Sequence, residues 1–203
     1  MSNSIREGTN YLAKIDPVMK KIIDTYEMPI LTPQSQLFVT LCESIISQQL
    51  SVKAARAIKN KVYQYFQQGL DPITIMQTPD EVLKTLGLSR SKVSYLKDLS
   101  HRCIAGELCF DQLVSLEDEE IILQLVKVKG IGVWTAQMFL IFGLNRLDVF
   151  PTGDLGIKKA IGQNYGFSDL PKEDEIQGIG EKWKPYRSIA SLYLWKSLNN
   201  TPS

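Results

Sequence analysis

The sequence has few of the features that cross-link a protein or anchor it in a membrane. Its three cysteines, Cys42, Cys103 and Cys109, are widely spaced, and no CxxC motif or His/Cys pairing suggests a zinc or iron–sulfur site. No apolar run approaches the roughly 20 residues that a membrane-spanning helix needs, and the N-terminus has no apolar signal core. These absences exclude a disulfide-stapled miniprotein and a membrane protein, and we expect an intracellular protein with reduced cysteines.

The charges nearly cancel, but they are unevenly distributed. Lys+Arg 23 against Asp+Glu 22 gives a formal net charge of +1, whereas a domain that binds nucleic acid electrostatically is usually strongly basic. Cations nevertheless gather in three segments, 51–61, 84–102 and 182–196, and acidic residues gather at 117–120 and 169–181. A basic face is compatible with this segregation, and the small net charge would keep any non-specific binding to nucleic acid modest and salt-sensitive.

Apolar residues recur at helical spacing along nearly the whole chain. Leu37, Leu41 and Ile45 fall on one face of a helix, and residues 121–126 continue an apolar pattern after the acidic start at 117–120. No stretch of four or more residues alternates apolar and polar residues between turn signals, so no sheet is predicted. Breaks at proline and glycine divide the chain into about eight to ten helices. The sequence therefore predicts an all-α protein.

The most informative segment runs from Leu125 to Ala136, where one helix ends, a Gly130-Ile131-Gly132 turn follows and a new helix begins at once. Both glycines permit positive φ and the close approach of another backbone. The turn and the following helix start present backbone N–H groups, which bind an anion without reading base sequence and so suit a DNA phosphate. The same residues also fit a plain helix–turn–helix corner in which the glycines only end a helix.

A carboxylate follows this segment. Asp154 comes after the loop 151–153 and before a helical pattern that begins at Leu155. It therefore lies at or near a helix N-terminus, where the helix dipole favours a negative charge. From this residue alone, an ordinary N-cap aspartate is the simpler interpretation.

Several tracts together resemble one protein family. The hairpin has the pattern apolar-x-Gly-apolar-Gly-x-x-Thr-Ala of a helix-hairpin-helix motif. Such a motif, followed after 18 residues by an aspartate, as Ala136 is followed by Asp154 here, resembles the HhH-GPD superfamily of DNA base-excision glycosylases. The tracts similar to the alkylation-repair branch, the 3-methyladenine DNA glycosylases, are 44–55, 148–159 and 183–190. The resemblance runs from residue 34 to 198 in the family's order, which makes it far more specific than any single motif.

The resemblance implies two helical subdomains flanking a DNA-binding cleft. Residues 34–142 would form the central subdomain, which ends in the helix-hairpin-helix at 120–142. Residues 1–33 together with 143–203 would form the second subdomain, which carries the catalytic aspartate. The implied partner is double-stranded DNA that contains damaged bases, without a membrane, and a monomer is the default. Such a protein is expected in the cytoplasm and nucleoid or in the nucleus.

The resemblance places Asp154 on the family's catalytic aspartate, and two hairpin positions depart from related patterns. Members that also cleave the strand carry a lysine two residues after the second glycine, and its amine attacks the sugar. This chain has Trp134 there, which implies base release without lyase activity. The family usually has proline where this chain has Lys129, so a cation replaces a rigid turn residue beside the proposed phosphate.

The segment between two amphipathic helices matches the family's wedge position. Gln49 corresponds to the residue that fills the gap left by a flipped nucleotide, and a glutamine can hydrogen-bond the orphaned base. Gln48 and Leu50 would add contacts beside it. The alternative interpretation is a polar turn between helices.

Flat apolar side chains match the family's base pocket. Trp134 and Trp195 correspond to aromatic pocket positions, and Met138, one helical turn beyond Trp134, would line the same face. An alkylated purine is cationic, so stacking on these rings would select it. The alternative interpretation is core packing.

Contacts to DNA phosphates are expected at two glycine turns. Ser89 and Lys92 follow Gly87 and fit a second backbone clamp, although the same turn fits a merely solvated loop. Family members often hold a monovalent cation under the hairpin with backbone carbonyls, and no other cofactor or metal is predicted. At the hairpin itself the expected contacts are made by Lys129, Gly130, Gly132, Val133 and Thr135.

The resemblance thus predicts a monofunctional DNA glycosylase that initiates base-excision repair. It would flip alkylated purines of the 3-methyladenine and 7-methylguanine type from the duplex and hydrolyse their N-glycosidic bonds. Two alternatives stay open: a non-catalytic helix-hairpin-helix protein that binds DNA structure, and a glycosylase for another lesion, such as ethenoadenine or hypoxanthine.

Overall fold

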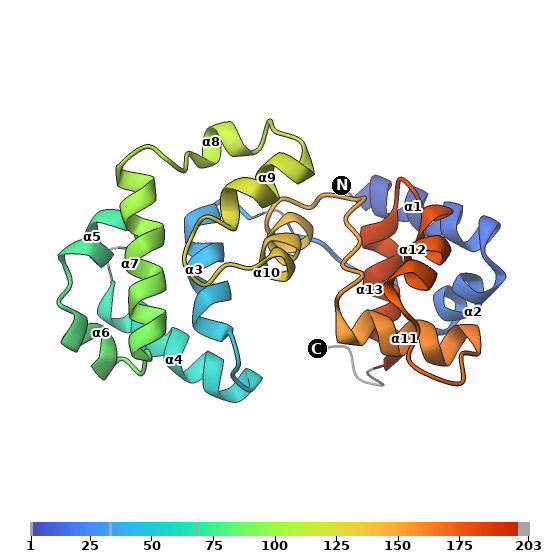
Figure 1. Ribbon diagram of the computed structural model, residues 1–203, viewed down its shortest axis with the longest axis horizontal. Helices are drawn as coiled ribbons and strands as arrows, with labels where there is room; N and C mark the ends of the chain where they lie inside the picture. Colours follow the sequence, from blue (N-terminus) through green and yellow to red (C-terminus); the bar gives the residue numbers. More distant parts are fainter. Residues whose placement is uncertain (1, 33, 68, 199–203) are drawn as a thin grey trace. The chain divides into compact units, whose positions relative to one another are not determined.

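The computed structural model describes residues 2–32, 34–67 and 69–198 (Figure 1). Within these ranges the regular elements are helices and no strand is present, so the prediction of an all-α protein is confirmed. None of the described helices is long and apolar enough to cross a membrane.

The chain divides into two compact units. The central unit is Gln34–Phe139, and the terminal unit combines Met1–Pro33 with Leu140–Ser203. The two ends of the sequence therefore fold together, although the whole central unit separates them along the chain.

The central unit is built around its longest described helix. This helix, α7, has 15 residues and packs against α5, α3 and α6. Its buried residues Val93, Leu96 and Leu99 recur every three positions, which places them on one face of the helix. The helices described in this unit are α3 (Leu37–Ser47), α4 (Val52–Tyr65), α5 (Pro72–Gln77), α6 (Asp80–Thr85), α7 (Arg90–Ile104), α8 (Phe110–Leu113), α9 (Asp118–Leu125) and α10 (Val133–Met138).

The terminal unit surrounds one apolar helix. Helix α13 (Arg187–Leu198) is buried at every residue from Ser188 to Leu194 and packs against α11, α2 and α1. A helix that is buried on all sides forms the centre of a core rather than a face of it. The other α-helices described in this unit are α1 (Ser2–Ile15), α2 (Pro17–Thr25), α11 (Leu155–Tyr165) and α12 (Glu173–Glu181), and a π-helix, η1 (Phe139–Gly143), follows α10.

The described residues form thirteen α-helices, more than the eight to ten predicted. The difference lies in short helices such as α5 and α8, which have six and four residues. Helix α5 begins in a stretch that the sequence marks as a break, where Asp71 and Thr74 form a capping box around Pro72. Such short helices are stable because they pack on longer ones, and no periodic pattern reveals them.

A buried aspartate joins the two chain ends within the terminal unit. Asp16 is 1% exposed and caps α2, where its Oδ1 accepts hydrogen bonds from two backbone N–H groups. Its Oδ2 accepts bonds from Tyr165 Oη (2.6 Å) and Trp183 Nε1 (2.9 Å), and Lys182 Nζ lies 3.1 Å away. Burial alone would raise the pKa of Asp16, but these bonds outweigh it and hold the pKa below the ordinary value of 3.8.

We expect Asp16→Asn to lower the free energy of unfolding at pH 7 by about 3 kcal/mol, because it breaks a buried charged network. The control is Asp24→Asn, which removes the exposed pair of Asp24 with Lys20 (2.6 Å) and should cost less than about 0.5 kcal/mol. Urea unfolding of the variants measures both values. Equal losses in the two variants would contradict the role of Asp16.

The lowered pKa of Asp16 predicts that its contribution to folding stability depends on pH. Because the folded pKa of Asp16 is depressed, its contribution is fully present above the unfolded pKa and is lost as the pH falls through the folded pKa. The stability difference between wild type and Asp16→Asn should therefore narrow as the pH falls below 3.8. A difference that stays constant with pH would show that the charge of Asp16 contributes nothing.

Candidate nucleic-acid interface and active site

The loop between α3 and α4, Gln48–Ser51, displays one glutamine and anchors the other. Gln48 Nε2 donates a hydrogen bond to the carbonyl oxygen of Gly130 (2.8 Å), so this loop is tied to the hairpin. Gln49 is exposed and has a φ of +56°, a conformation that costs a non-glycine residue about 1 kcal/mol. Leu50 is 36% exposed beside it. The loop thus holds Gln49 outward in a strained backbone conformation, and such strain is often found at functional sites.

The two glycines of the hairpin have different roles. Gly130 has a φ of +79°, and a Cβ there would lie 2.2 Å from Cδ2 of Tyr95. Gly132 has a φ of −94° and precedes α10 as its N-cap, and a Cβ there would meet no atom within 4 Å. Both glycines permit a positive φ, and Gly130 adopts one whereas Gly132 does not. Gly130 shapes the turn against Tyr95, whereas Gly132 leaves open space next to a helix start.

Lys129 contributes a backbone group that proline lacks. Its N–H donates to Oδ2 of Asp98 (2.9 Å), and its Nζ lies 3.8 Å from Oδ1 of Asp98. Arg102 Nε also binds Asp98 (3.1 Å). Burial would raise the pKa of Asp98, but the bonds from Lys129 and Arg102 lower it overall. A hydrogen bond to α7 thus takes the place of the ring that would stiffen this turn.

The second glycine turn is bound to the end of α3. Ser89 caps α7, where its Oγ accepts from the backbone N–H of Lys92 (3.2 Å). Lys92 Nζ donates to the carbonyl oxygen of Ile46 (2.7 Å), and partial burial lowers its pKa. The ammonium therefore stabilises the C-terminal end of α3 next to the α3–α4 loop, and its contact with DNA stays a prediction.

These three segments meet in one cavity of the central unit. Its volume is about 480 Å³, and the α3–α4 loop, the start of α7 and the hairpin all contribute to it. Trp134 is 49% exposed at its edge, which is unusual for so large an aromatic side chain. The lining residues are Gln48, Gln49, Ser89, Ser91, Lys92, Tyr95, Gly130, Trp134 and Thr135.

Tyr95, which was not among the predicted residues, both lines this cavity and packs on Gly130. Its position three residues after Lys92 places the two side chains on the same face of α7, and that spacing was the available signal. Among the predicted residues of the central unit, those that do not line the cavity are Leu50, Lys129, Gly132, Val133 and Met138.

Asp154 is held by two hydrogen bonds in the terminal unit. It caps α11, and its Oδ1 accepts from the backbone N–H of Ile157 (2.8 Å) and from Trp195 Nε1 (2.8 Å). The side chain is nearly buried at 9% exposure. The predicted N-cap geometry is therefore present, and the indole of Trp195 adds a second donor that fixes the carboxylate.

Two further residues make this contact possible. A Cβ at Gly156 would lie 2.9 Å from Oδ1 of Asp154 and 3.0 Å from Cδ1 of Trp195, so a side chain there would push the two apart. Phe142 stacks on the Trp195 ring, with the ring centroids 5.9 Å apart and the planes 28° from parallel. The orientation of the indole is thus set by packing as well as by its hydrogen bond.

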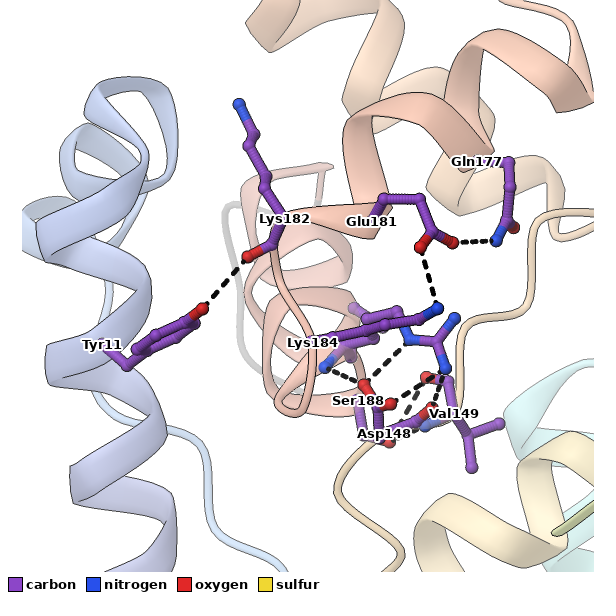
Figure 2. A network of polar contacts seen from close by, with 10 residues as sticks. Tyr11, Asp148, Val149, Gln177, Glu181, Lys182, Lys184 and Ser188 are labelled. Atoms are coloured by element: carbon purple, nitrogen blue, oxygen red, sulfur yellow. Dashed lines mark hydrogen bonds and ion pairs between the residues drawn. The ribbon is translucent and has the colours of Figure 1, made fainter.

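The segment that leads to Asp154 is bound to α13. Arg187 donates from Nε to Oδ1 of Asp148 (2.8 Å) and from Nη2 to Oδ2 (2.9 Å), a two-point contact that fixes orientation. Ser188 Oγ accepts from the backbone N–H of Val149 (2.9 Å). Figure 2 shows these contacts around Asp148, Val149 and Ser188. Asp148 is therefore a structural residue, and α13 holds the segment at its beginning through Arg187 and at its end through Trp195.

The same region continues into a network around the end of α12. Glu181 accepts hydrogen bonds from Lys184 Nζ (2.8 Å) and Gln177 Nε2 (2.6 Å), and Tyr11 donates to the carbonyl oxygen of Lys182 (3.4 Å) (Figure 2). These contacts connect α1 and α12 to the turn before α13. Contacts from α1 and from α12 thereby fix the turn that positions Arg187.

The predicted site residues thus form two sets. The central unit carries the α3–α4 loop, the second glycine turn, the hairpin and Trp134, and the terminal unit carries Asp154 and Trp195. No group of three or more His, Cys, Asp or Glu side chains that could hold a metal ion occurs in the described ranges. At the hairpin, the carbonyl oxygens of Val128 and Gly130 accept bonds from Ile131 N (3.1 Å) and Gln48 Nε2 (2.8 Å). A monovalent cation there stays a prediction.

Comparison with known proteins gives consistent results. The family model of the HhH-GPD superfamily base excision DNA repair proteins matches residues 42–185. DNA-3-methyladenine glycosylase 1 of Schizosaccharomyces pombe is 30% identical over 96% of this chain and 88% of its own length. A putative DNA-3-methyladenine glycosylase of Bacillus subtilis, YfjP, is 34% identical over 78% of this chain, which spans only 58% of that relative.

Solved structures agree with these relatives. The S. pombe 3-methyladenine DNA glycosylase in complex with abasic DNA matches with a TM-score of 0.85 at 29% identity, over 97% of this chain and all of that one (100%). The DNA-3-methyladenine glycosidase of Bacillus halodurans matches with a TM-score of 0.83 at 34% identity, over 93% and 87% of the two chains. Since the family model covers well over half of the residues, this chain belongs to the HhH-GPD superfamily of base excision DNA repair proteins.

Proposed function

We propose that this chain is a monofunctional DNA glycosylase that removes alkylated purines, of the 3-methyladenine and 7-methylguanine type, from double-stranded DNA. The observation that carries the proposal is the Asp154 carboxylate, which the N–H groups of Ile157 and Trp195 fix at the start of α11. Relatives similar over most of this chain are named 3-methyladenine DNA glycosylases. Its place of action is the compartment that holds DNA, and it acts as a monomer.

The proposed reaction is hydrolysis of the N-glycosidic bond. The bond between C1′ and the base breaks with its electron pair going to the base, which neutralises the positive charge that alkylation placed there. The positive charge then develops at C1′, where a carboxylate stabilises it electrostatically. Water bonds to C1′ and loses a proton, for which Asp154 is the proposed acceptor or orienting group. No second carboxylate has to protonate the base, because the alkylated base is already a good leaving group.

The hairpin supports release of the base without cleavage of the strand. Trp134 stands where strand-cleaving members of the family carry a lysine, and an indole nitrogen is no nucleophile toward the sugar. In the proposed complex, the N–H groups after Gly132 bind a phosphate and the exposed Gln49 enters the gap left by the flipped nucleotide. Base binding by Trp134, Met138 and Trp195 stays a prediction.

We expect Asp154→Asn to bind DNA as the wild type does and to lose base release by at least about 100-fold, since it removes the charge that stabilises the reacting sugar. Asparagine is an equally good N-cap, so the fold is retained. The measurement is single-turnover release of methylated bases from alkylated duplex DNA. The control, Asp174→Asn, changes an exposed aspartate in the first turn of α12 and should act as wild type. Full activity of Asp154→Asn would refute the proposal.

We expect Trp195→Phe to slow base release about 10-fold at saturating protein while the Kd for DNA stays unchanged. Phenylalanine keeps the ring that stacks on Phe142 but lacks the N–H that orients Asp154, and misorientation by a fraction of an ångström costs rate rather than affinity. Single-turnover rates together with fluorescence anisotropy separate the two quantities. Weaker DNA binding at an unchanged rate would mean that Trp195 serves binding and does not position Asp154.

The two hairpin glycines give a paired test. Gly132→Ala should keep wild-type stability, because its backbone and surroundings accept a Cβ, yet weaken DNA binding about 10-fold, or about 1.4 kcal/mol, if a phosphate lies there. Gly130→Ala should lose about 1–3 kcal/mol of stability from its φ and its clash with Tyr95. Thermal unfolding and anisotropy titrations measure both. Unchanged DNA binding by Gly132→Ala would leave the hairpin as a plain helix stop.

A further inference from the structure

A second cavity borders the α3–α4 loop and has no part in the reaction described above. It has a volume of about 510 Å³ and lies along α3 and α4. Ser47 and Leu50 line it, whereas Gln48 and Gln49 line the cavity at the hairpin, and the two cavities share no lining residue. The α3–α4 loop therefore separates two cavities of the central unit. The remaining lining residues are Glu43, Val52, Ala55, Arg56, Lys59, Asn60 and Tyr63.

The second cavity carries a positive charge that the protein does not neutralise. Helix α4 has four cations and no acidic residue, and Arg56 and Lys59 line the cavity. Lys59 Nζ lies 3.4 Å from Oε2 of Glu43, and Tyr63 donates a hydrogen bond to the other oxygen of that carboxylate. The charge of Glu43 is thus matched by Lys59. Arg56 is exposed and forms no ion pair with any described residue.

Apolar groups lie next to this charge. Val52 is 84% exposed, Tyr63 is 41% exposed and Leu50 is 36% exposed. A small anion alone would gain nothing from such a border, whereas a sugar–phosphate backbone presents an anionic phosphate and an apolar deoxyribose at every step. The combination of an arginine with exposed apolar groups therefore fits a nucleic-acid strand.

We propose that this cavity binds the backbone of the DNA strand opposite the damaged base, with Arg56 on a phosphate. The proposal rests on the proposed function, because it takes the α3–α4 loop as the segment inserted into the duplex. A segment that enters the minor groove, about 6 Å wide, has one strand on either side of it. In this arrangement the phosphate bound at the hairpin belongs to the strand that carries the damaged base, and the cavity along α4 then faces the other strand. Gln49 then meets the orphaned base while Arg56 grips the strand to which that base belongs.

The salt dependence of DNA binding tests the contact of Arg56. We expect Arg56→Ala to lower the slope of log K against log salt concentration by about 1, since each neutralised phosphate contributes about 0.9. The matched control is Lys61→Ala, which removes the same charge from the same helix. Lys61 does not line the cavity. It follows the lining residue Lys59 by two positions and so projects from α4 about 200° around the helix axis from it. We expect Lys61→Ala to change the salt slope by much less than Arg56→Ala does. Equal changes of the slope in the two variants would overturn the proposal.

Neutral methylphosphonate groups, placed singly in one strand of a duplex with an abasic site, test which strand is bound. One or two substitutions opposite the abasic site should weaken wild-type binding, and Arg56→Ala should be insensitive to the same substitutions. Sensitivity lost only in the strand that carries the abasic site would overturn the strand assignment. Wild-type base release from methylated DNA, measured in parallel, tests the proposed function by itself, because the binding measurements need no turnover.

Discussion

A carboxylate that stabilises charge on a sugar must be fixed before the substrate arrives, and α13 provides this constraint in the terminal unit. Trp195 donates to Asp154 from one end of the helix, and Arg187 binds Asp148 from the other. Gly156 leaves room for the indole. The buried course of α13 through the unit keeps both contacts at a constant separation, so the segment 148–154 is held at its two ends.

In the central unit, the side-chain amide of Gln48 fixes the α3–α4 loop to the hairpin, much as α13 fixes the segment 148–154 in the terminal unit. The bond from Gln48 to the carbonyl of Gly130 connects residues 82 positions apart, and Lys92 fastens α7 to the end of α3 beside it. These contacts bring three segments around one cavity, and they leave Gln49 displayed in a left-handed conformation. A tied loop with one strained, exposed residue is preorganised for insertion, because little conformational entropy remains to be lost on binding.

Local patterns predicted much of this arrangement. Helical periodicity was sufficient for the fold class, and the order of the tracts was sufficient for the family. The N-cap position of Asp154 followed from the Pro/Gly loop before it and the apolar spacing after it. The short helices α5 and α8 were missed because one or two turns have no detectable period, whereas the start of α6 follows from the tract Thr78-Pro79-Asp80-Glu81, in which acidic residues follow a proline.

Contacts between distant segments could not be predicted in the same way. The indole of Trp195 reaches a residue 41 positions away, and the N–H of Lys129 reaches Asp98, 31 positions away. The exchange of proline for Lys129 suggested an added cation and the loss of a rigid turn residue, whereas the structure uses the backbone N–H that lysine brings. Tyr95 was hidden because its role against Gly130 depends on packing between α7 and the hairpin.

The central claim is that Asp154 stabilises charge on the sugar without a partner acid, so the base must already be cationic in the DNA and leaves as a neutral molecule. Single-turnover release by the wild-type chain across matched duplexes tests this most directly. The duplexes would contain 3-methyladenine, 7-methylguanine, hypoxanthine or ethenoadenine. We expect the two cationic bases to be released much faster than the two neutral ones, with the DNA strand left intact. Release of the neutral bases at least as fast, or tight binding of every duplex with no release, would contradict the claim.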